Sequence, residues 1–435
     1  MTGLRPRIVW FIRYGIPGFA IRMAARRGDL IARSAVDPSA MENPAQLYDG
    51  LRALGPLGGN RLVGASAHHA VVNEILRSEA FFANPGGGPT KTLDRIMTAA
   101  IDPRALGPVD VPSLLAIQPP QHARIRRLVT HAFTPRAIAS YTDQIRAIAN
   151  DLLDRAEAKG DRFDLITDYA TRLPVQVIAD IMGIPPEMHD ELLQIGNDAA
   201  TTLDPALTWR EFKVADAAIR QAAVLFGEHI AELRRNPGDD LLSHLVQVNQ
   251  DGDKLSDEEL RVNTLLLLGA GFETTVNLIG NAVALLLEHR DQLEKLQADP
   301  SGWPNAVDEV LRYDSPVQVT IRVANRETEV AGQAVPQGRA VVLMLGAANR
   351  DPAVFADPER FDVTREDARL HLSFSAGIHY CLGAQLARLE AAIALEVLFE
   401  RFPDLAIAGT PVRRNTRVLH GFEHLPVAAA PAAVH

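Results

Sequence analysis

The sequence predicts a mainly α-helical protein with small β-sheets, folded as a single large domain. Apolar residues recur at spacings of three and four over long stretches, whereas stretches with the pattern of a β-strand are few and short. No Ser- or Gly-rich linker and no repeat divides the 435 residues. With 47% hydrophobic and 23% charged residues, the composition is that of a globular protein with a large core.

Three helices follow from the spacing of apolar residues alone, over residues 141–158, 208–235 and 384–399. The β-type stretches are much shorter and are bounded by turn residues. We expect strands at residues 61–65, 318–323, 329–331, 340–345 and 416–427.

A fourth helix is predicted to cross the whole domain. Ser256 and Glu259 form a capping box, and helical character continues to about Arg290, which gives a length of roughly 50 Å at 1.5 Å per residue. Its centre is apolar enough to suggest a membrane span. However, a polar stripe that starts at Glu273 recurs every four residues, which favours a buried core helix.

Two stretches interrupt the helical pattern, at residues 84–120 and 183–207. Both contain several prolines and glycines, so we predict loops. Long loops in a compact domain often act as lids or binding loops, and these two are expected to cover a pocket.

The chain divides into a basic extension at residues 1–37, the main domain at 38–427 and an Ala/Pro-rich tail at 428–435. In the first 33 residues, seven arginines face a single acid, Asp29. The apolar run that ends at Arg13 is too short for a signal peptide or for the roughly 20 residues of a membrane span. We therefore expect a cytoplasmic protein without a transmembrane segment. The extension is expected to pack on the protein's own surface, and contact with an anionic membrane is the alternative.

The net charge of −10 argues against nucleic acid as a partner and favours small-molecule ligands. The single cysteine, Cys381, excludes an internal disulfide and the attachment of a haem through paired cysteines.

Cys381 lies just before the predicted helix 384–399. Backbone N–H groups and the positive end of the helix dipole favour a thiolate there, and hence metal ligation. Gly377 and Gly383 permit a tight turn and the close approach of a flat cofactor, and Phe374 can shield the sulfur. For an isolated cysteine, the alternative is a small buried hydrophobic residue.

The stretch from Phe374 to Gly383 resembles the haem-binding loop of the cytochromes P450, Phe-x-x-Gly-x-His/Arg-x-Cys-x-Gly, with every fixed position filled. The resemblance covers nearly the whole main domain. It implies the cytochrome P450 fold and a non-covalent haem b whose iron has Cys381 as its axial ligand. Phe374, Gly377 and Gly383 then belong to the cofactor-binding residues.

Further motifs follow in the order of the family. Glu309 and Arg312 resemble its Glu-x-x-Arg pair, which shares one helix face, and Arg360 of a Pro-Glu-Arg-Phe motif is the implied third member of a structural triad. The resemblance also implies four residues that hold the haem propionates: His122, Arg126, Arg322 and His379.

The segment Gly269 to Thr275 lies inside the long predicted helix, where each glycine costs about 1 kcal/mol relative to alanine. Close helix packing is one explanation. The segment is also similar to the oxygen-activation motif of the family. That similarity implies two catalytic residues: Glu273 relays protons, and Thr274 positions water in an otherwise apolar pocket.

The resemblance therefore implies a haem-thiolate monooxygenase that inserts one oxygen atom from O2 into a C–H bond of a lipophilic small molecule. By position in the family and by apolar character, seven residues are expected to line the substrate pocket. They are Leu266, Ala270, Gly271, Val317, Val319, Thr320 and Phe422.

We expect no reductase domain on the chain, so electrons from NAD(P)H should arrive through a ferredoxin reductase and a ferredoxin. Arg124, Arg127 and Arg388 could attract an acidic ferredoxin or be ordinary solvated arginines. Three alternatives stay open: a peroxide-driven haem peroxygenase, a non-catalytic haem carrier or sensor, and a Cys–His hydrolase centred on Cys381.

Overall fold

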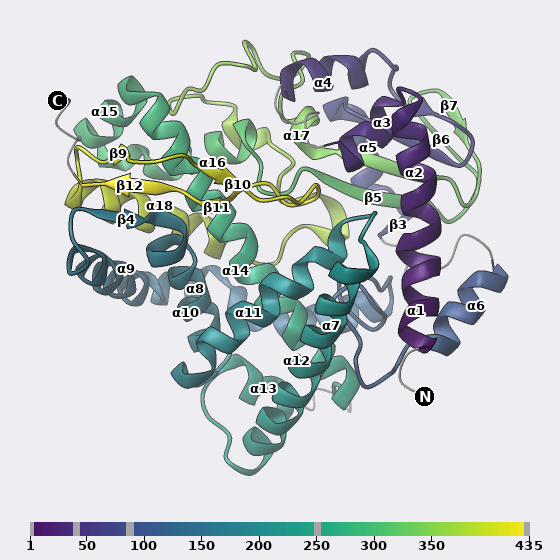
Figure 1. Cartoon of the computed structure of the whole chain (residues 1–435), viewed down its shortest axis with the longest axis horizontal. Coiled ribbons are helices and arrows are strands. Elements are labelled where there is room, and N and C mark those ends of the chain that lie inside the picture. The colour runs from purple at the N-terminus through teal and green to yellow at the C-terminus, as the bar shows by residue number, and fades with distance from the viewer. Residues whose placement is uncertain (1–3, 38–43, 84–90, 248–253, 430–435) are drawn as a thin grey trace.

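The computed structural model describes residues 4–37, 44–83, 91–247 and 254–429 (Figure 1). Helices dominate the fold, as predicted, and the strands form small sheets. The longest helix, α14 (Asp257–Glu288), crosses the middle of the molecule. Five helices pack around it: α10 (Arg172–Ile181), α11 (His189–Ala200), α12 (Trp209–Arg235), α16 (Trp303–Tyr313) and α18 (Ala384–Arg401).

The start of α14 is the predicted capping box. The Glu259 N–H donates to the Ser256 hydroxyl over 3.1 Å, and the Ser256 N–H donates to the Glu259 carboxylate over 2.9 Å. The helix ends at Glu288 rather than near Arg290, because His289 has a non-helical backbone (φ −111°, ψ 69°) and α15 (Arg290–Ala298) begins after it.

The predicted burial of α14 is confirmed. Among the described residues, α14 is the one helix long and apolar enough to cross a membrane, but 72% of its most apolar stretch lies inside the protein. The polar stripe is also internal. Asn281 is fully buried, and its amide donates to the carbonyls of Asp314 and His420. These bonds satisfy a polar group in the core, where an unpaired amide would be costly.

The predicted helices 141–158, 208–235 and 384–399 correspond to α9 (Thr142–Glu157), α12 and α18. The remaining helices are shorter. They are α1 (Leu4–Trp10), α2 (Ile16–Arg26), α3 (Leu30–Val36), α4 (Pro44–Arg52), α5 (His69–Arg77), α6 (Lys91–Ala100), α7 (Gln121–Val129), α8 (Pro135–Ser140), α13 (Leu241–Gln247) and α17 (Leu345–Ala348).

The prediction of two long loops is confirmed only for residues 101–120, which contain no helix or strand. Residues 183–207 contain α11, whose buried side chains, among them Leu192 and Ile195, follow helical spacing. Residues 84–120 contain α6, although residues 84–90 lie outside the described part. Prolines and glycines near or within these helices, such as Pro186 before α11 and Gly196 inside it, hide the helical pattern in the sequence. Pro is in fact favoured near a helix start.

The main sheet has five strands in the order β1 (Gly58–Gly59), β2 (Val63–Ser66), β8 (Ala340–Met344), β5 (Val319–Ala324) and β3 (Phe81–Ala83). Strands β2 and β8 are parallel and the other pairs are antiparallel. A second sheet has the order β4 (Arg162–Asp164), β12 (Pro426–Ala428) and β9 (Ala406–Ile407). Two strand pairs complete the set: β6 (Thr328–Val330) with β7 (Gln333–Val335), and β10 (Val412–Arg413) with β11 (Phe422–His424).

Candidate functional site

The Cys381 loop lies between the main sheet and the start of α18. The Cys381 N–H donates to the Phe374 carbonyl over 2.9 Å and closes the loop. Gly377 has a φ of +68°, and a Cβ there would lie 2.6 Å from the carbonyl oxygen of Leu76 in α5. The fold therefore requires glycine at 377, as the predicted tight turn implies. At Gly383 φ is −85° and no atom lies within 4 Å of a Cβ position. Neither the backbone conformation nor the packing therefore requires glycine at 383.

The environment of the Cys381 thiol contains opposing influences. The protein atoms that crowd the sulfur raise the pKa of the thiol, whereas the Gly383 backbone N–H and the charges of Arg126 and Arg388 lower it. Crowding is the larger effect, although the residue itself is exposed to solvent, and the thiolate favoured by the helix start stays a prediction. A metal ion bound to the sulfur would deprotonate the thiol outright.

Beside this loop, the structure brings together the four residues predicted to hold propionates. The rings of His122 and His379 lie 4.5 Å apart between centroids, from α7 and from the Cys381 loop. Arg126 follows His122 by one helical turn, and its guanidinium donates to the Tyr380 carbonyl over 2.8 Å. Arg322 reaches the same region from β5 and donates over 3.4 Å to the Ser375 hydroxyl of the loop.

All four side chains of this cluster are basic, and its two arginines carry the positive charge. Arg322 is 5% exposed, its hydrogen-bond partners are hydroxyl and carbonyl oxygens, and burial lowers its pKa to about 10. Burial and the neighbouring charges lower the pKa of His379 to about 3, and its Nε2 is buried without a hydrogen-bond partner. Within the described ranges, no carboxylate forms an ion pair with Arg126 or Arg322. Two carboxylates of a bound haem fit this arrangement.

The predicted pair Glu309 and Arg312 is a fully buried, bidentate ion pair, with N–O distances of 2.7 and 2.8 Å. The predicted third member, Arg360, requires a correction. Its side chain is 64% exposed and pairs with Asp362, while its backbone carbonyl accepts from Arg312 over 3.1 Å. Arg365, with a 9% exposed side chain, instead contacts Glu309 over 3.3 Å. The chain turns Arg360 outward and Arg365 inward, and the motif around Arg360 did not indicate this.

Glu273 and Thr274 are adjacent on α14 but face different surroundings. Glu273 is 3% exposed, and its carboxylate pairs with Arg414 over 2.6 Å. Burial raises the pKa of Glu273, the Arg414 charge opposes this, and the second carboxylate oxygen has no hydrogen-bond partner. The Thr274 hydroxyl donates to the Ala270 carbonyl over 2.9 Å. Sequence reasoning missed Arg414, which lies 141 positions away along the chain.

Several predicted pocket residues share one accessible face. Leu266, Ala270 and Thr274 follow each other at intervals of four on α14, and none of them is fully buried. Val317, Val319 and Thr320 are likewise partly buried, at and just before the start of β5. These residues are therefore available to line a pocket.

Two of the predicted pocket residues lie elsewhere. A Cβ at Gly271 would lie 3.0 Å from Ile178 of α10, so close helix packing explains this glycine. Phe422 is 5% exposed in the main core, with the Arg413 guanidinium 3.7 Å from its ring centroid. The C-terminal segment instead approaches the predicted pocket at Leu419, which forms an isolated β-bridge with Val317, two residues before β5.

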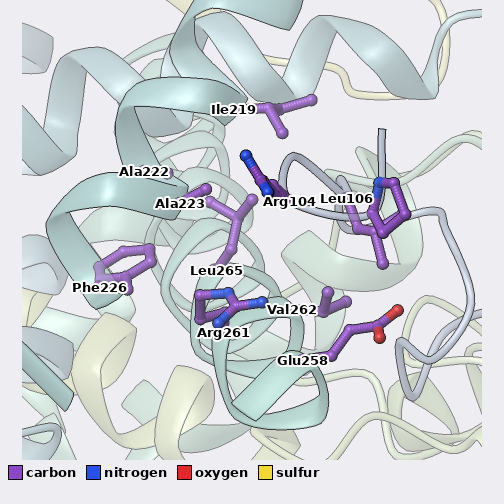
Figure 2. Close-up of a pocket in the computed structure, with 11 residues that line it drawn as sticks. Arg104, Leu106, Ile219, Ala222, Ala223, Phe226, Glu258, Arg261, Val262 and Leu265 are labelled. Atoms are coloured by element: carbon purple, nitrogen blue, oxygen red, sulfur yellow. The ribbon is translucent and has the colours of Figure 1, made fainter. Parts of the chain in front are cut away.

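A small cavity lies between α12, α14 and the segment before α7 (Figure 2). Its volume of about 10 Å³ leaves room for one water molecule at most, so it cannot be a substrate site. Its lining includes Leu106, Ile219, Ala222, Phe226, Val262 and Leu265.

All three arginines proposed to attract a ferredoxin already take part in interactions within the chain. Arg124 pairs with the capping-box residue Glu259. Arg388 pairs with Asp308 over 2.7 Å, and its guanidinium lies 4.6 Å from the Phe374 ring centroid. Arg127 is exposed. The charge available for docking is therefore smaller than the sequence suggested.

Comparison with known proteins identifies the family. Residues 110–300 and 304–417 match the family model described as cytochrome P450. The chain is 41% identical over 436 residues to cytochrome P450 140 of Mycobacterium bovis, which covers 99% of each chain. CYP164A2 of Mycobacterium smegmatis, solved with econazole, has a TM-score of 0.83 at 36% identity and covers 92% of this chain and 99% of that one.

P450BioI was solved in complex with an acyl carrier protein that carries hexadec-9Z-enoic acid. It has a TM-score of 0.82 at 36% identity and covers 90% of this chain and 99% of that one. The matches extend over nearly the whole chain, in sequence and in fold alike. These matches exclude the alternative that the chain is a Cys–His hydrolase centred on Cys381. The chain therefore belongs to the cytochrome P450 family and is a haem-dependent monooxygenase.

Proposed function

We propose that this enzyme hydroxylates a lipophilic small molecule with electrons from NAD(P)H, delivered by a ferredoxin reductase and a ferredoxin. The observation that carries the proposal is the cluster of basic side chains beside the Cys381 loop, in which the buried Arg322 and the half-buried Arg126 lie close to His122 and His379. A buried cation without an anionic partner is costly unless a ligand supplies the opposite charge.

In this proposal, Cys381 would ligate the haem iron, and the four basic side chains would hold the two propionates. The bound haem supplies the iron at which O2 is reduced and activated, with electron density from the thiolate. Gly377 keeps the loop close to α5, and Phe374 covers the sulfur side together with the stacked Arg388 guanidinium. The loop therefore fixes the position of the ligand before the cofactor binds.

Glu273 and Thr274 are proposed to handle protons. Arg414 holds one oxygen of the Glu273 carboxylate, and the other oxygen, buried without a partner, can accept a proton. The Thr274 hydroxyl donates to the Ala270 carbonyl, which leaves its lone pairs free to accept from a water molecule. This pair also favours the O2-dependent reaction over a peroxide-driven one, which needs no proton delivery of this kind.

The accessible face of Leu266 and Ala270, with Val317 and Val319 opposite in the proposed pocket, favours an apolar substrate. Some relatives point the same way: P450BioI was solved with a fatty-acyl carrier protein, and CYP109E1 of Bacillus megaterium with testosterone. We propose a fatty acid, terpenoid, steroid, polyketide or aromatic compound as the substrate class.

The test is the visible spectrum of the purified protein, reduced under carbon monoxide. A Soret band far to the red of a histidine-ligated complex is expected, and Cys381→Ser should abolish it. Lipophilic candidates are then screened by the shift in iron spin state. Turnover with NADPH, ferredoxin reductase and ferredoxin is compared with turnover driven by peroxide. A preference for peroxide, or the absence of product with any candidate that shifts the spin state, would contradict the proposal.

A further inference from the structure

The N-terminal helices have one face that packs and one that does not. Helix α1, a π-helical turn at Phe11–Gly15 and helix α2 follow each other without a break along one edge of the molecule (Figure 1). Their inner face buries Val9, Ile12 and Tyr14, and Val9 and Tyr14 belong to a small apolar cluster that includes Phe212 of α12. The expectation that this segment packs on the protein's own surface is thus confirmed for the inner face.

The outer face carries large apolar side chains in contact with solvent. Leu4 is 70% exposed, Phe11 55% and Phe19 65%. They are spaced by seven and eight residues, about two helical turns each, and the π-helical turn accommodates the extra residue, so the three share one side. We call these three residues the outer face. Large exposed apolar side chains that share one side of a helical segment can mark an interaction surface when neighbouring apolar surface joins them.

A neighbouring groove extends the outer face. Helix α1 packs beside α6, and Ile96 of α6 is 46% exposed. The open groove between these elements has a volume of about 690 Å³. Its floor includes Trp10 and Trp209, whose rings meet edge-on 5.7 Å apart. Tryptophan is the side chain that favours the boundary between the apolar and polar parts of a bilayer.

Positive charge surrounds the outer face, although the whole chain has a net charge of −10. Asp29, the single acid of residues 1–33, caps helix α3 and accepts from the Ala32 N–H. Five exposed arginines form no ion pair with a carboxylate of the described residues. They are Arg5, Arg7, Arg22, Arg26 and Arg27.

We infer that the outer face, with its ring of arginines, docks on the surface of a bilayer that contains anionic lipid. The helices lie in the plane of the interface, with Leu4, Phe11 and Phe19 among the acyl chains and the arginines at the phosphates. A second copy of the chain is a poorer occupant. A two-fold axis would bring the same arginines against each other, and like charges repel.

Sedimentation of the full-length holoenzyme with vesicles tests the inference. Vesicles of phosphatidylcholine alone are compared with an equimolar mixture of phosphatidylcholine and phosphatidylglycerol. Binding is expected on the mixture, weak on phosphatidylcholine, and reduced by salt. Each arginine near such a surface strengthens binding by about fivefold, so Arg26→Glu should weaken it at least that much. The double variant Phe11→Ser, Phe19→Ser should weaken it more than about tenfold.

Matched controls come from the opposite edge of the molecule. Arg162 in β4 is exposed and Ile407 in β9 is 44% exposed, and both strands belong to the sheet farthest from α1 in Figure 1. Arg162→Glu and Ile407→Ser should bind as wild type does. Haem content and the thermal midpoint check that each variant is folded.

Two results would overturn the inference. One is equal sedimentation of wild type and the Phe11, Phe19 double variant. The other is that wild type is a dimer, that the double variant is a monomer, and that neither protein binds vesicles. That result would assign the outer face to contact with a second copy. Neither result bears on the haem chemistry, because the spectrum and turnover are measured without vesicles.

Discussion

Arg414, in the C-terminal segment, forms a 2.6 Å ion pair with Glu273 in the middle of α14, and both side chains are largely withdrawn from solvent. The Arg414 guanidinium also donates to the Phe422 carbonyl over 3.2 Å, which fixes its position. The acid proposed to relay protons is thus held by a residue from the other end of the domain. Its charge opposes the rise in the pKa of Glu273 that burial causes.

Replacing Arg414 by glutamine should raise the pKa of Glu273, because burial would then act without an opposing charge. The limb of the pH profile that reports Glu273 should move to higher pH, and less product should form per NADPH consumed. Arg413→Gln is the control, since Arg413 pairs with Asp314 and contacts Asn281 rather than Glu273. An unmoved profile in Arg414→Gln would show that the ion pair is only structural.

Thr274→Ala should uncouple NADPH consumption from product formation and release hydrogen peroxide, because the hydroxyl that positions water is lost. The measurement is the ratio of product to NADPH, with peroxide assayed in parallel. Thr275→Val is the matched control, since the Thr275 hydroxyl donates to the Gly271 carbonyl on the neighbouring, buried side. Coupling equal to wild type in Thr274→Ala would refute the role.

Arg322→Leu should change apo-protein stability and haem affinity in opposite directions. Arg322 is a buried cation without an ion-pair partner among the described residues, so its loss should leave the apo-protein as stable or more stable. Haem should be held more weakly by about 1.5–3 kcal/mol, the value of a hydrogen bond to a charged group. Thermal unfolding of the apo-protein and the rate of haem transfer to apomyoglobin measure the two effects. An unchanged rate of haem transfer would exclude Arg322 from the propionate site. The control is Arg326→Leu, because Arg326 is exposed.

Arg365→Leu should destabilise the fold by about 1–3 kcal/mol, because Glu309 would lose a partner inside the protein. Arg360→Leu should change stability by less than about 0.5 kcal/mol, because that side chain is 64% exposed. Urea unfolding of the two variants compares them directly. The reverse order would restore Arg360 as the third member of the triad.

Glu390 of α18 should make stability depend on pH. Burial raises its pKa well above 4.5, and one carboxylate oxygen has no hydrogen-bond partner. Above about pH 4.5 the unfolded chain releases a proton that the folded state keeps. The loss of folding stability caused by Glu390 is therefore absent below about pH 4.5 and grows as pH rises above it. Glu390→Gln should stabilise the protein by roughly 1–3 kcal/mol at neutral pH and by little at pH 4. Glu400→Gln, exposed on the same helix, should have no such effect.

The sequence by itself determined the features that depend on local spacing. The capping box at Ser256 and the turn at Gly377 follow from neighbouring residues, and the structure has both. The bidentate pair of Glu309 and Arg312 also lies within one helical turn. The Cys381 motif identified the family because its fixed positions lie within ten consecutive residues.

Only the tertiary structure decided which distant residues meet and which way side chains face. Arg414 reaches Glu273 because the C-terminal segment crosses α14, and no spacing rule joins positions that far apart. Arg365 rather than Arg360 turns inward, and Phe422 enters the core, because the surrounding backbone directs them there. Periodicity shows that a helix has two faces, but the partner that covers each face is set by long-range packing, which the sequence alone does not specify.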